Sequence, residues 1–283
     1  MSKTLPIPFF SSLFPHTSSL APMSDTRITS TASASTAHAL QLENVGRVFG
    51  ALAAVAEVDL DVKAGERRAV LGANGAGKTT LFNLITGDFA PSSGTIRFFG
   101  EDVTRLKPHA RIRRGLRRTY QSSLLFKQLS VRDNIYLSVR GATGSRYSML
   151  RPCNDDPTVA ETERLVHAVH LDSIADTPVG SLSHGQQRQL ELGMALSGAP
   201  RFLLLDEPAA GLSPRERGEL IQILNLLPAH IGYIIIEHDL DVALRVSSFV
   251  TVMHNGRIFK HGTPDEIEAD PDVQRIYLGG KHG

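Results

Sequence analysis

The chain has 283 residues, of which 41% are hydrophobic and 21% charged, a composition typical of a globular protein with a substantial core. Thirty lysines and arginines oppose 29 aspartates and glutamates, so the net charge of +1 gives no general attraction to nucleic acid or anionic lipid. The single cysteine, Cys153, excludes an internal disulfide and fits a reducing compartment. No apolar run approaches the ~20 residues that cross a bilayer, which argues against a membrane-spanning protein.

Residues 1–38 differ in composition from the rest of the chain, being rich in Ser, Thr, Ala and Pro. Such a segment buries too little apolar surface to offset its ordering entropy, so we predict a disordered extension. A targeting peptide fits poorly because Pro6 and Pro8 interrupt the apolar stretch. Translation starting at Met23 is a second alternative.

The remaining sequence alternates between strand and helix patterns. Apolar and acidic residues alternate over 57–62, as in a half-buried strand, and residues 67–71 predict a buried strand that enters a glycine-rich turn. Residues 78–86 then predict a helix that Gly87 can cap. Further strands are predicted at 94–99, 202–205, 232–236 and 249–253, and helices at 108–115, 130–139, 159–169, 185–197, 213 onward and 239–246. This alternation predicts an α/β core, into which a mostly helical stretch at about 118–198 is inserted.

Residues 72–79 read G-A-N-G-A-G-K-T and fit the phosphate-loop pattern G-x-x-x-x-G-K-[ST] between a strand and a helix. The glycines let backbone N–H groups converge on phosphate oxygens, and the helix N-terminus adds a positive dipole end. Lys78 is expected to reach the outer phosphates and Thr79 to offer its hydroxyl to Mg²⁺. An ordinary glycine-rich turn is the alternative. The predicted nucleotide contacts of this loop are Gly72, Asn74, Gly75, Gly77, Lys78, Thr79 and Thr80.

An acidic pair follows the apolar run at 202–205. The strand delivers Asp206 at its carboxyl end, where ligands bind in open α/β sheets. We expect Asp206 to hold Mg²⁺ through water and Glu207 to polarise the attacking water as a general base. A solvated acidic pair at a strand end is the alternative.

Four more segments complete a resemblance to the ATP-binding-cassette (ABC) family. L-S-H-G-Q at 182–186 resembles its signature motif, and Gln121 in R-T-Y-Q matches its Q-loop. His238 in I-E-H-D matches the switch histidine, and Phe49 resembles the aromatic residue that stacks on adenine. Each of these residues alone has an ordinary structural explanation, but their order and spacing over 40–279 are specific.

The resemblance implies a phosphate-loop ABC ATPase core with an antiparallel β subdomain and an inserted helical subdomain, within a domain of residues 39–280. It also implies that two cassettes stack head to tail, so that each ATP lies between the phosphate loop of one subunit and the signature motif of the other. Ser183 and Gly185 would then donate to the γ-phosphate, with Gln186 beside them. His238 would be a catalytic residue that stabilises the transferred phosphoryl group.

Gln121 would sense Mg²⁺ and relay occupancy to a partner, which makes it both a catalytic and a metal-site candidate, alongside Thr79 and Asp206. Two positions depart from the family pattern. His184 stands where the signature motif usually has glycine, and we expect it to leave nucleotide binding unaffected. Ser213 stands where the family often has aspartate, so it is expected to contribute a helix cap if nothing else.

Several stretches are similar to the ATPases of branched-chain amino-acid and urea or amide importers: R-R-T-Y-Q at 117–121, L-D-E-P-A-A-G-L at 205–212, and the tail at 270–279. The resemblance implies an ATPase that powers import, using ATP and Mg²⁺, with integral-membrane permeases, a second ABC ATPase and, indirectly, an extracytoplasmic solute-binding protein as partners. It implies no nucleic-acid partner and a peripheral place on the cytoplasmic face of the inner membrane. The ATPase of a lipopolysaccharide exporter, which shares the P-H-A-R segment at 108–111, is the alternative, and a non-transport ABC ATPase is a weaker one.

The stretch 105–118 holds seven lysines and arginines and no acid. A solvated helix face is one explanation. Contact with lipid headgroups or an acidic permease loop is another, because the stretch lies beside Gln121. A nucleic-acid site is a third, less favoured one.

Overall fold

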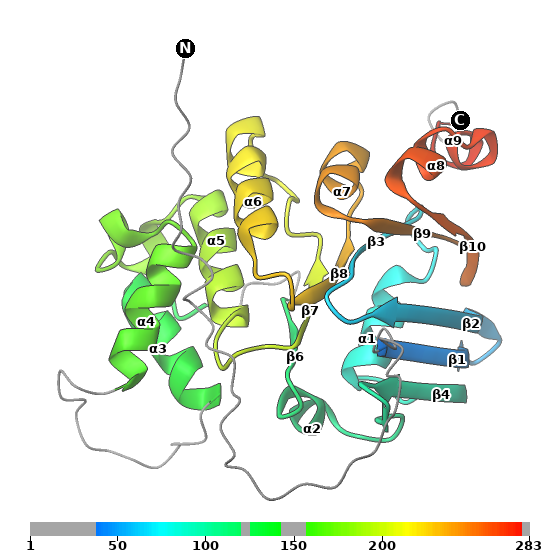
Figure 1. The fold of residues 1–283 in the computed structure, drawn as a ribbon, viewed down its shortest axis with the longest axis horizontal. Helices are drawn as coiled ribbons and strands as arrows, with labels where there is room; N and C mark the ends of the chain where they lie inside the picture. The colour runs from blue at the N-terminus through cyan, green and yellow to red at the C-terminus, as the bar shows by residue number, and fades with distance from the viewer. Residues whose placement is uncertain (1–37, 120–124, 143–156, 279–283) are drawn as a thin grey trace, which may run out of the picture.

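The computed structural model describes residues 38–119, 125–142 and 157–278, and their side chains to residue 275 (Figure 1). Residues 1–37 and Gln121 lie outside the described residues, so the predictions made for them stay untested. Within the described chain, two sheets and the helices packed on them make up the molecule.

The first sheet is antiparallel, with strand order β2-β1-β4-β5. Its strands are β1 (His38–Phe49), β2 (Leu52–Lys63), β4 (Ser93–Phe98) and β5 (Glu101–Asp102). In β2, Val58, Leu60 and Val62 are buried while the acidic residues between them are exposed, which confirms the predicted alternation. This sheet is the antiparallel β subdomain that the family resemblance implied.

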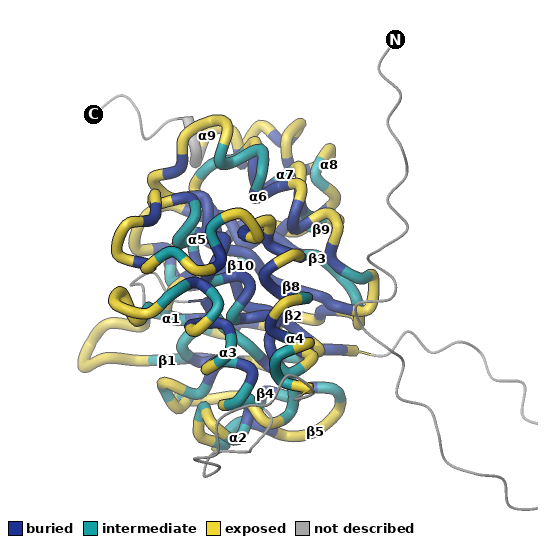
Figure 2. The backbone as a smooth tube through the Cα atoms, turned by 90° about the vertical axis from the view of Figure 1, so that its left-hand side faces the viewer, coloured by how far each residue is buried: buried dark blue, intermediate teal, exposed yellow. Residues whose placement is uncertain are grey.

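The second sheet has the order β10-β9-β3-β8-β7-β6 and is parallel except for β10. Its strands are β3 (Arg67–Leu71), β6 (Leu116–Arg118), β7 (Phe202–Asp206), β8 (Gly232–Ile236), β9 (Phe249–His254) and β10 (Arg257–Gly262). Every residue of β7 and β8 is buried, and these strands lie in the middle of the molecule (Figure 1). The tube around β8 in Figure 2 is correspondingly dark blue. Strands covered on both faces carry continuous apolar runs, as the sequence of these two does.

Helices cover the parallel sheet on both faces. They are α1 (Lys78–Thr86), α2 (Pro108–Ile112), α3 (Val131–Ala142), α4 (Pro157–Ala168), α5 (His184–Ala195), α6 (Pro214–Leu226), α7 (Leu240–Val246), α8 (Pro264–Glu268) and α9 (Pro271–Leu278), with 3₁₀ turns η2 (Asp172–Ile174) and η3 (Val179–Ser181). Alternate residues of β7 enter two cores: Leu203 and Leu205 pack with the helices α3 to α7, while Phe202 and Leu204 pack with α1 and the antiparallel sheet.

The predicted insertion is confirmed. Helices α3, α4 and α5 contact one another and form the group drawn at the left of Figure 1, between β6 and β7 in the chain. The predicted helix at 78–86 has the predicted bounds and ends on Gly87 in the left-handed conformation. Ser213 caps α6 in a capping box with Glu216, as the sequence indicated. Among the described helices, none has both the length and the apolarity to cross a membrane.

The basic stretch 105–118 is not a single solvated face, which corrects the first explanation offered for it. Arg111 is 1% exposed and donates to four main-chain carbonyls, among them those of Leu84 and Ile85 at the end of α1. Arg114 pairs with Glu101. Arg118 is buried against the parallel sheet. At least three of the seven cations therefore have intramolecular partners.

Candidate functional site

Three parallel strands end at one level and place the predicted residues side by side. In the sheet register, Ile236 of β8 pairs with Val70 of β3 on one side and with Asp206 of β7 on the other. The phosphate loop, Glu207 and His238 follow these three strands directly. Residues far apart in the sequence therefore meet at the carboxyl edge of the sheet, where ligands of open α/β folds bind.

The phosphate loop opens on a cavity of about 540 Å³. Gly77 has φ = 102°, and a Cβ atom there would lie 2.6 Å from the carbonyl oxygen of Ala54, so only glycine fits this turn. The cavity is lined by the predicted residues Asn74, Gly75, Gly77, Lys78, Thr79, Thr80, Glu207 and His238, and by Leu52, Ala53, Ala54, Ala76, Asn255 and Gly256. The last two residues and those from β2 were not predicted, because only the tertiary fold brings them to the loop.

The Lys78 ammonium group lies inside the loop. Its Nζ donates to the carbonyl oxygen of Gly72 at 2.6 Å and to that of Ala73 at 3.1 Å. Burial lowers the pKa of Lys78, and the nearby charges of Glu207 and Asp206 act against that shift. A lysine cation held within this loop, beside the cavity, is suited to bind the outer phosphates of a nucleotide.

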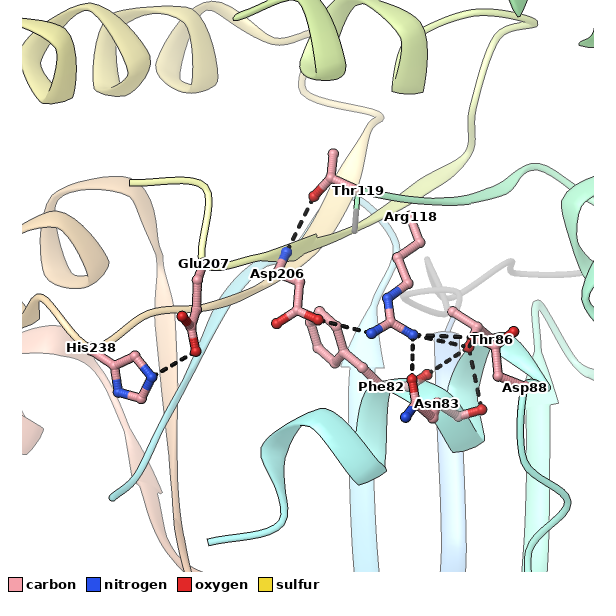
Figure 3. A network of polar contacts seen from close by, with 9 residues as sticks. All are labelled: Phe82, Asn83, Thr86, Asp88, Arg118, Thr119, Asp206, Glu207 and His238. Atoms are coloured by element: carbon pink, nitrogen blue, oxygen red, sulfur yellow. Dashed lines mark hydrogen bonds and ion pairs between the residues drawn. The ribbon is translucent and has the colours of Figure 1, made fainter. Parts of the chain in front are cut away.

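Asp206 is paired with Arg118, a residue that the sequence analysis quoted in a motif but gave no role (Figure 3). Nη2 of Arg118 lies 2.8 Å from Oδ2 of Asp206, and the two side chains are 6% and 1% exposed. Nη1 of Arg118 also contacts Asn83 and Asp88. The guanidinium therefore ties the end of β7 to α1.

The second oxygen of Asp206, Oδ1, is buried and accepts no hydrogen bond from the described residues. A buried carboxylate oxygen without a donor is costly, and a hydrated cation would satisfy it. Carboxylate and hydroxyl oxygens are the ligands that Mg²⁺ takes beside nucleotide phosphates. Asp206 and the Thr79 hydroxyl therefore fit the predicted magnesium site, for which Gln121 cannot be assessed.

Glu207 and His238 form a close pair at the edge of the cavity (Figure 3). His238 Nε2 lies 2.6 Å from Oε1 of Glu207, whose side chain is 15% exposed. Glu207 has φ = 48°, a strained conformation for a non-glycine residue, and its N–H donates to the Ile236 carbonyl. A carboxylate held towards a cavity by a neighbouring imidazole has the geometry of a general base with an orienting partner.

Glu237 is a buried acid that the sequence analysis quoted without assigning a role. It is 2% exposed, and its Oε1 accepts from the N–H of Ala209 at 2.8 Å. Burial raises the pKa of Glu237 to about 7, with the charges of Glu207 and Asp239 adding to the shift. This side chain therefore holds the loop that follows Glu207 through its hydrogen bond with Ala209.

The signature motif lies away from the phosphate loop, at the N-terminus of α5 (Figure 1). Ser183 caps that helix in a capping box with Gln186. Ser183 and Gln186 line a second cavity, of about 390 Å³, that shares no residue with the first. His184 is not among the residues that line this cavity. Its Nε2 instead lies 3.1 Å from the Ala210 carbonyl oxygen. The described chain thus holds the phosphate loop and the signature motif at two separate cavities.

Phe49 is placed at the tip of the β1–β2 hairpin. Its ring contacts Phe89 edge-on at 5.4 Å between centroids, and the Arg47 guanidinium lies 4.7 Å from its centre. It is not among the residues that line the phosphate-loop cavity, where Leu52 stands instead. The stacking role of Phe49 stays a prediction.

Comparisons with known proteins agree with this geometry. The ABC transporter family model matches residues 55–210, and the branched-chain amino acid ATP-binding cassette transporter model matches residues 261–283. The chain is 34% identical over 250 residues to the high-affinity branched-chain amino acid transport ATP-binding protein BraF of Pseudomonas aeruginosa, which covers 85% of this chain and 97% of that protein. It is 33% identical over 245 residues to the lipopolysaccharide export system ATP-binding protein LptB of Escherichia coli K12, with the same coverage of 85% and 97%.

A solved structure has the same fold. It is the ADP conformation of an ATP-binding cassette of an ABC transporter, with a TM-score of 0.75 and 30% sequence identity. The match covers 86% of this chain and 99% of that one.

Proposed function

Because the chain belongs to the ABC transporter family of ATP-binding proteins, we propose that it is the ATP-hydrolysing subunit of an importer for branched-chain amino acids or related small polar solutes. It is an ATPase coupled to transport, and ATPase subunits of this family pair and work with membrane permeases. The observation that carries the proposal is the meeting of Lys78, Glu207 and His238 around one cavity.

In the proposed mechanism, Lys78 and the loop N–H groups bind and orient the phosphates of ATP. Glu207 accepts a proton from the attacking water, whose oxygen bonds to the γ-phosphorus as the bond to the β-phosphate oxygen breaks and ADP leaves. His238 holds Glu207 in place through Nε2 and stabilises the transferred phosphoryl group. Asp206 Oδ1 and the Thr79 hydroxyl would hold Mg²⁺, which when bound neutralises phosphate charge. Positioning and electrostatics supply most of the catalysis in such phosphoryl transfers.

Import is favoured over export by the C-terminal segment, where residues 261–283 match the branched-chain amino acid transporter model. The resemblance to BraF points the same way, while that to LptB supports a lipopolysaccharide exporter as the second candidate. The importer would include two permeases, a second cassette and an extracytoplasmic solute-binding protein. The chain would then lie peripherally on the cytoplasmic face of the membrane.

Glu207→Gln tests the assigned base. We expect ATP turnover to fall by at least about 10²-fold, because the amide cannot accept the proton, while ATP binding persists. Steady-state phosphate release and equilibrium binding of labelled ATP measure the two effects. The matched variant Glu268→Gln removes an exposed acid outside both the phosphate-loop cavity and the signature cavity and should leave turnover unchanged. Ordinary turnover in Glu207→Gln would mean that another group is the base.

The same Glu207→Gln chain tests the partners. Tagged and purified from native membranes with ATP, it should bring down two multi-span permeases and a second cassette, which mass spectrometry identifies. Recovery of export permeases with a periplasmic bridge protein would favour the second candidate. A chain that recovers ribosomes or DNA in place of permeases would contradict a role in transport.

A further inference from the structure

The acidic side chain of Glu216, from α6, is hydrogen-bonded to the N-terminus of α5. Oε1 of Glu216, in the first turn of α6, accepts from Ser183 Oγ at 3.1 Å and from the Gly185 N–H at 3.2 Å. These are the two donors that the family resemblance assigns to the γ-phosphate. A carboxylate oxygen therefore sits where a phosphate oxygen would be bound.

The surrounding geometry is fitted to this carboxylate. A Cβ atom on Gly185 would lie 2.3 Å from Glu216 Oε1, so glycine at this position is what lets the acid approach. The other oxygen, Oε2, accepts from the N–H and hydroxyl of Ser213, at 2.9 and 2.7 Å. Glu216 thus joins the first turns of two helices, and both helix dipoles favour its negative charge.

The hydrogen bonds keep this group charged. Those from Ser213, Ser183 and Gly185 lower the pKa of Glu216 to about 2, so it remains a carboxylate throughout the physiological range. The polar cavity beside it is open to a second molecule and is lined by Ser183, Gln186, Gln189, Ser213, Arg215, Glu216 and Glu219. An incoming triphosphate would meet the same donors and a negative charge already on them.

We propose that Glu216 is an internal competitor for the signature motif: it occupies the donors of Ser183 and Gly185, and ATP held by a second copy of this chain must displace it before the two copies close. This inference rests on the proposed function, because it assumes that the signature motif receives the γ-phosphate. Glu216 is then a positioning residue that sets how much ATP is needed for pairing. It does not touch the reacting atoms.

The test compares Glu216→Gln with Glu216 intact, both in the Glu207→Gln chain so that ATP is not consumed. Gln can still form the capping box with Ser213 through its one carbonyl oxygen, and it removes both the charge and the second acceptor oxygen that occupies the signature donors. We expect the ATP concentration for half-maximal pairing, measured by light scattering, to fall about tenfold. A hydrogen bond to a charged group exceeds a neutral one by about 1.4 kcal/mol, which is a factor of ten in an equilibrium constant.

Glu219→Gln is the matched control, because it removes an acid from the same cavity that pairs with Arg215 and touches neither signature donor. It should leave the ATP requirement within about twofold, and all variants should bind ATP as monomers with one affinity. An equal shift in both variants, an unchanged or raised requirement in Glu216→Gln, or an ATP-bound parent that stays monomeric would each overturn the inference. Loss of ATP binding or turnover in the unmodified chain would instead contradict the proposed function.

The melting temperature distinguishes displacement of Glu216 from a purely structural role of this residue. A structural role would lower the melting temperature of Glu216→Gln and weaken pairing together, whereas displacement predicts stronger pairing in a normally folded chain. If Glu216→Gln fails to fold, Glu216→Asp serves in its place. The shorter acid keeps the charge but withdraws from Gly185, so it too should lower the ATP requirement, and no change would count against displacement.

Discussion

At the scale of single residues, the tertiary structure shows a role for Arg118 that the sequence does not indicate. It forms an ion pair with Asp206 that is almost fully buried, and it also reaches Asn83 and Asp88. The pair fixes Oδ2 of Asp206 and leaves Oδ1 for the predicted magnesium site. Arg118 therefore orients a residue of the predicted magnesium site without being a candidate ligand itself.

Replacing Arg118 with Met is expected to lower the free energy of unfolding by about 3–5 kcal/mol, because it leaves a buried carboxylate without its counter-charge. Urea unfolding followed by circular dichroism measures the loss. Arg215→Met is the matched control: its ion pair with Glu219 is on the surface, with the Arg215 side chain 90% exposed, and its loss should cost less than about 1 kcal/mol. Equal losses would show that the Arg118 pair contributes no more than a surface pair.

Glu237 makes stability depend on pH. Its pKa is raised from 4.5 to about 7 in the folded chain, so the folded state binds the proton more tightly than the unfolded state does. The stabilisation is fully present below pH 4.5 and is lost as the pH rises through 7. The charged neighbours that oppose ionisation are Glu207 and Asp239.

Glu237→Gln should remove this dependence, since the amide oxygen can still accept from the Ala209 N–H and carries no charge. Relative to the unmodified chain, the variant should gain roughly 2–3 kcal/mol of stability between pH 5 and pH 8. Urea midpoints at both pH values measure this difference, and Glu219→Gln controls for a general charge effect. A gain of the same size at both pH values would contradict the assignment.

At the scale of elements, the end of α1 depends on an arginine from a later segment. Arg111 donates to the carbonyls of Leu84 and Ile85, which are left without partners inside the helix, and to those of Thr104 and Leu106. A Cβ atom on Gly87 would lie 2.8 Å from Nε of Arg111, so the glycine that ends α1 also makes room for this side chain.

Arg111→Met should therefore destabilise the chain by about 2–4 kcal/mol, because it removes four hydrogen bonds to buried or partly buried carbonyl groups, of which that of Leu84 keeps the Gly87 N–H as a donor. Chemical unfolding measures the effect. Arg113→Met, two residues away and exposed, should change stability by no more than about 0.5 kcal/mol. If Arg113→Met were as damaging as Arg111→Met, the position in the basic stretch and not the carbonyl contacts would be responsible.

At the scale of the whole molecule, the order of strands in the parallel sheet decides which site residues lie side by side. Strand β8 lies between β3 and β7 in the sheet although it follows both in the chain, so His238 is delivered between the phosphate loop and Asp206. The phosphate-loop cavity and the signature cavity share no lining residue, and each is one half of the composite site that the family resemblance implies.

The sequence by itself determined most elements and the chemistry of the cavity. The glycine spacing of the phosphate loop, the capping residues of α1 and α6, and the buried runs of β7 and β8 are local signals, because dihedral preference, helix capping and strand burial act within a few residues. The family motifs then indicated which polar residues line the cavity.

The tertiary structure alone decided the pairings across the chain. Arg118 with Asp206, Arg111 with the end of α1, and Glu216 with Ser183 and Gly185 each join residues about 26 to 88 positions apart. Nothing local distinguishes these charged residues from solvated ones, so the sequence predicts surface roles for the basic stretch and assigns no role to Glu216 beyond a helix start. The packing of strands and helices decides which charged side chains are buried and which groups they contact. Burial is a property of the assembled core and not of a local stretch of sequence.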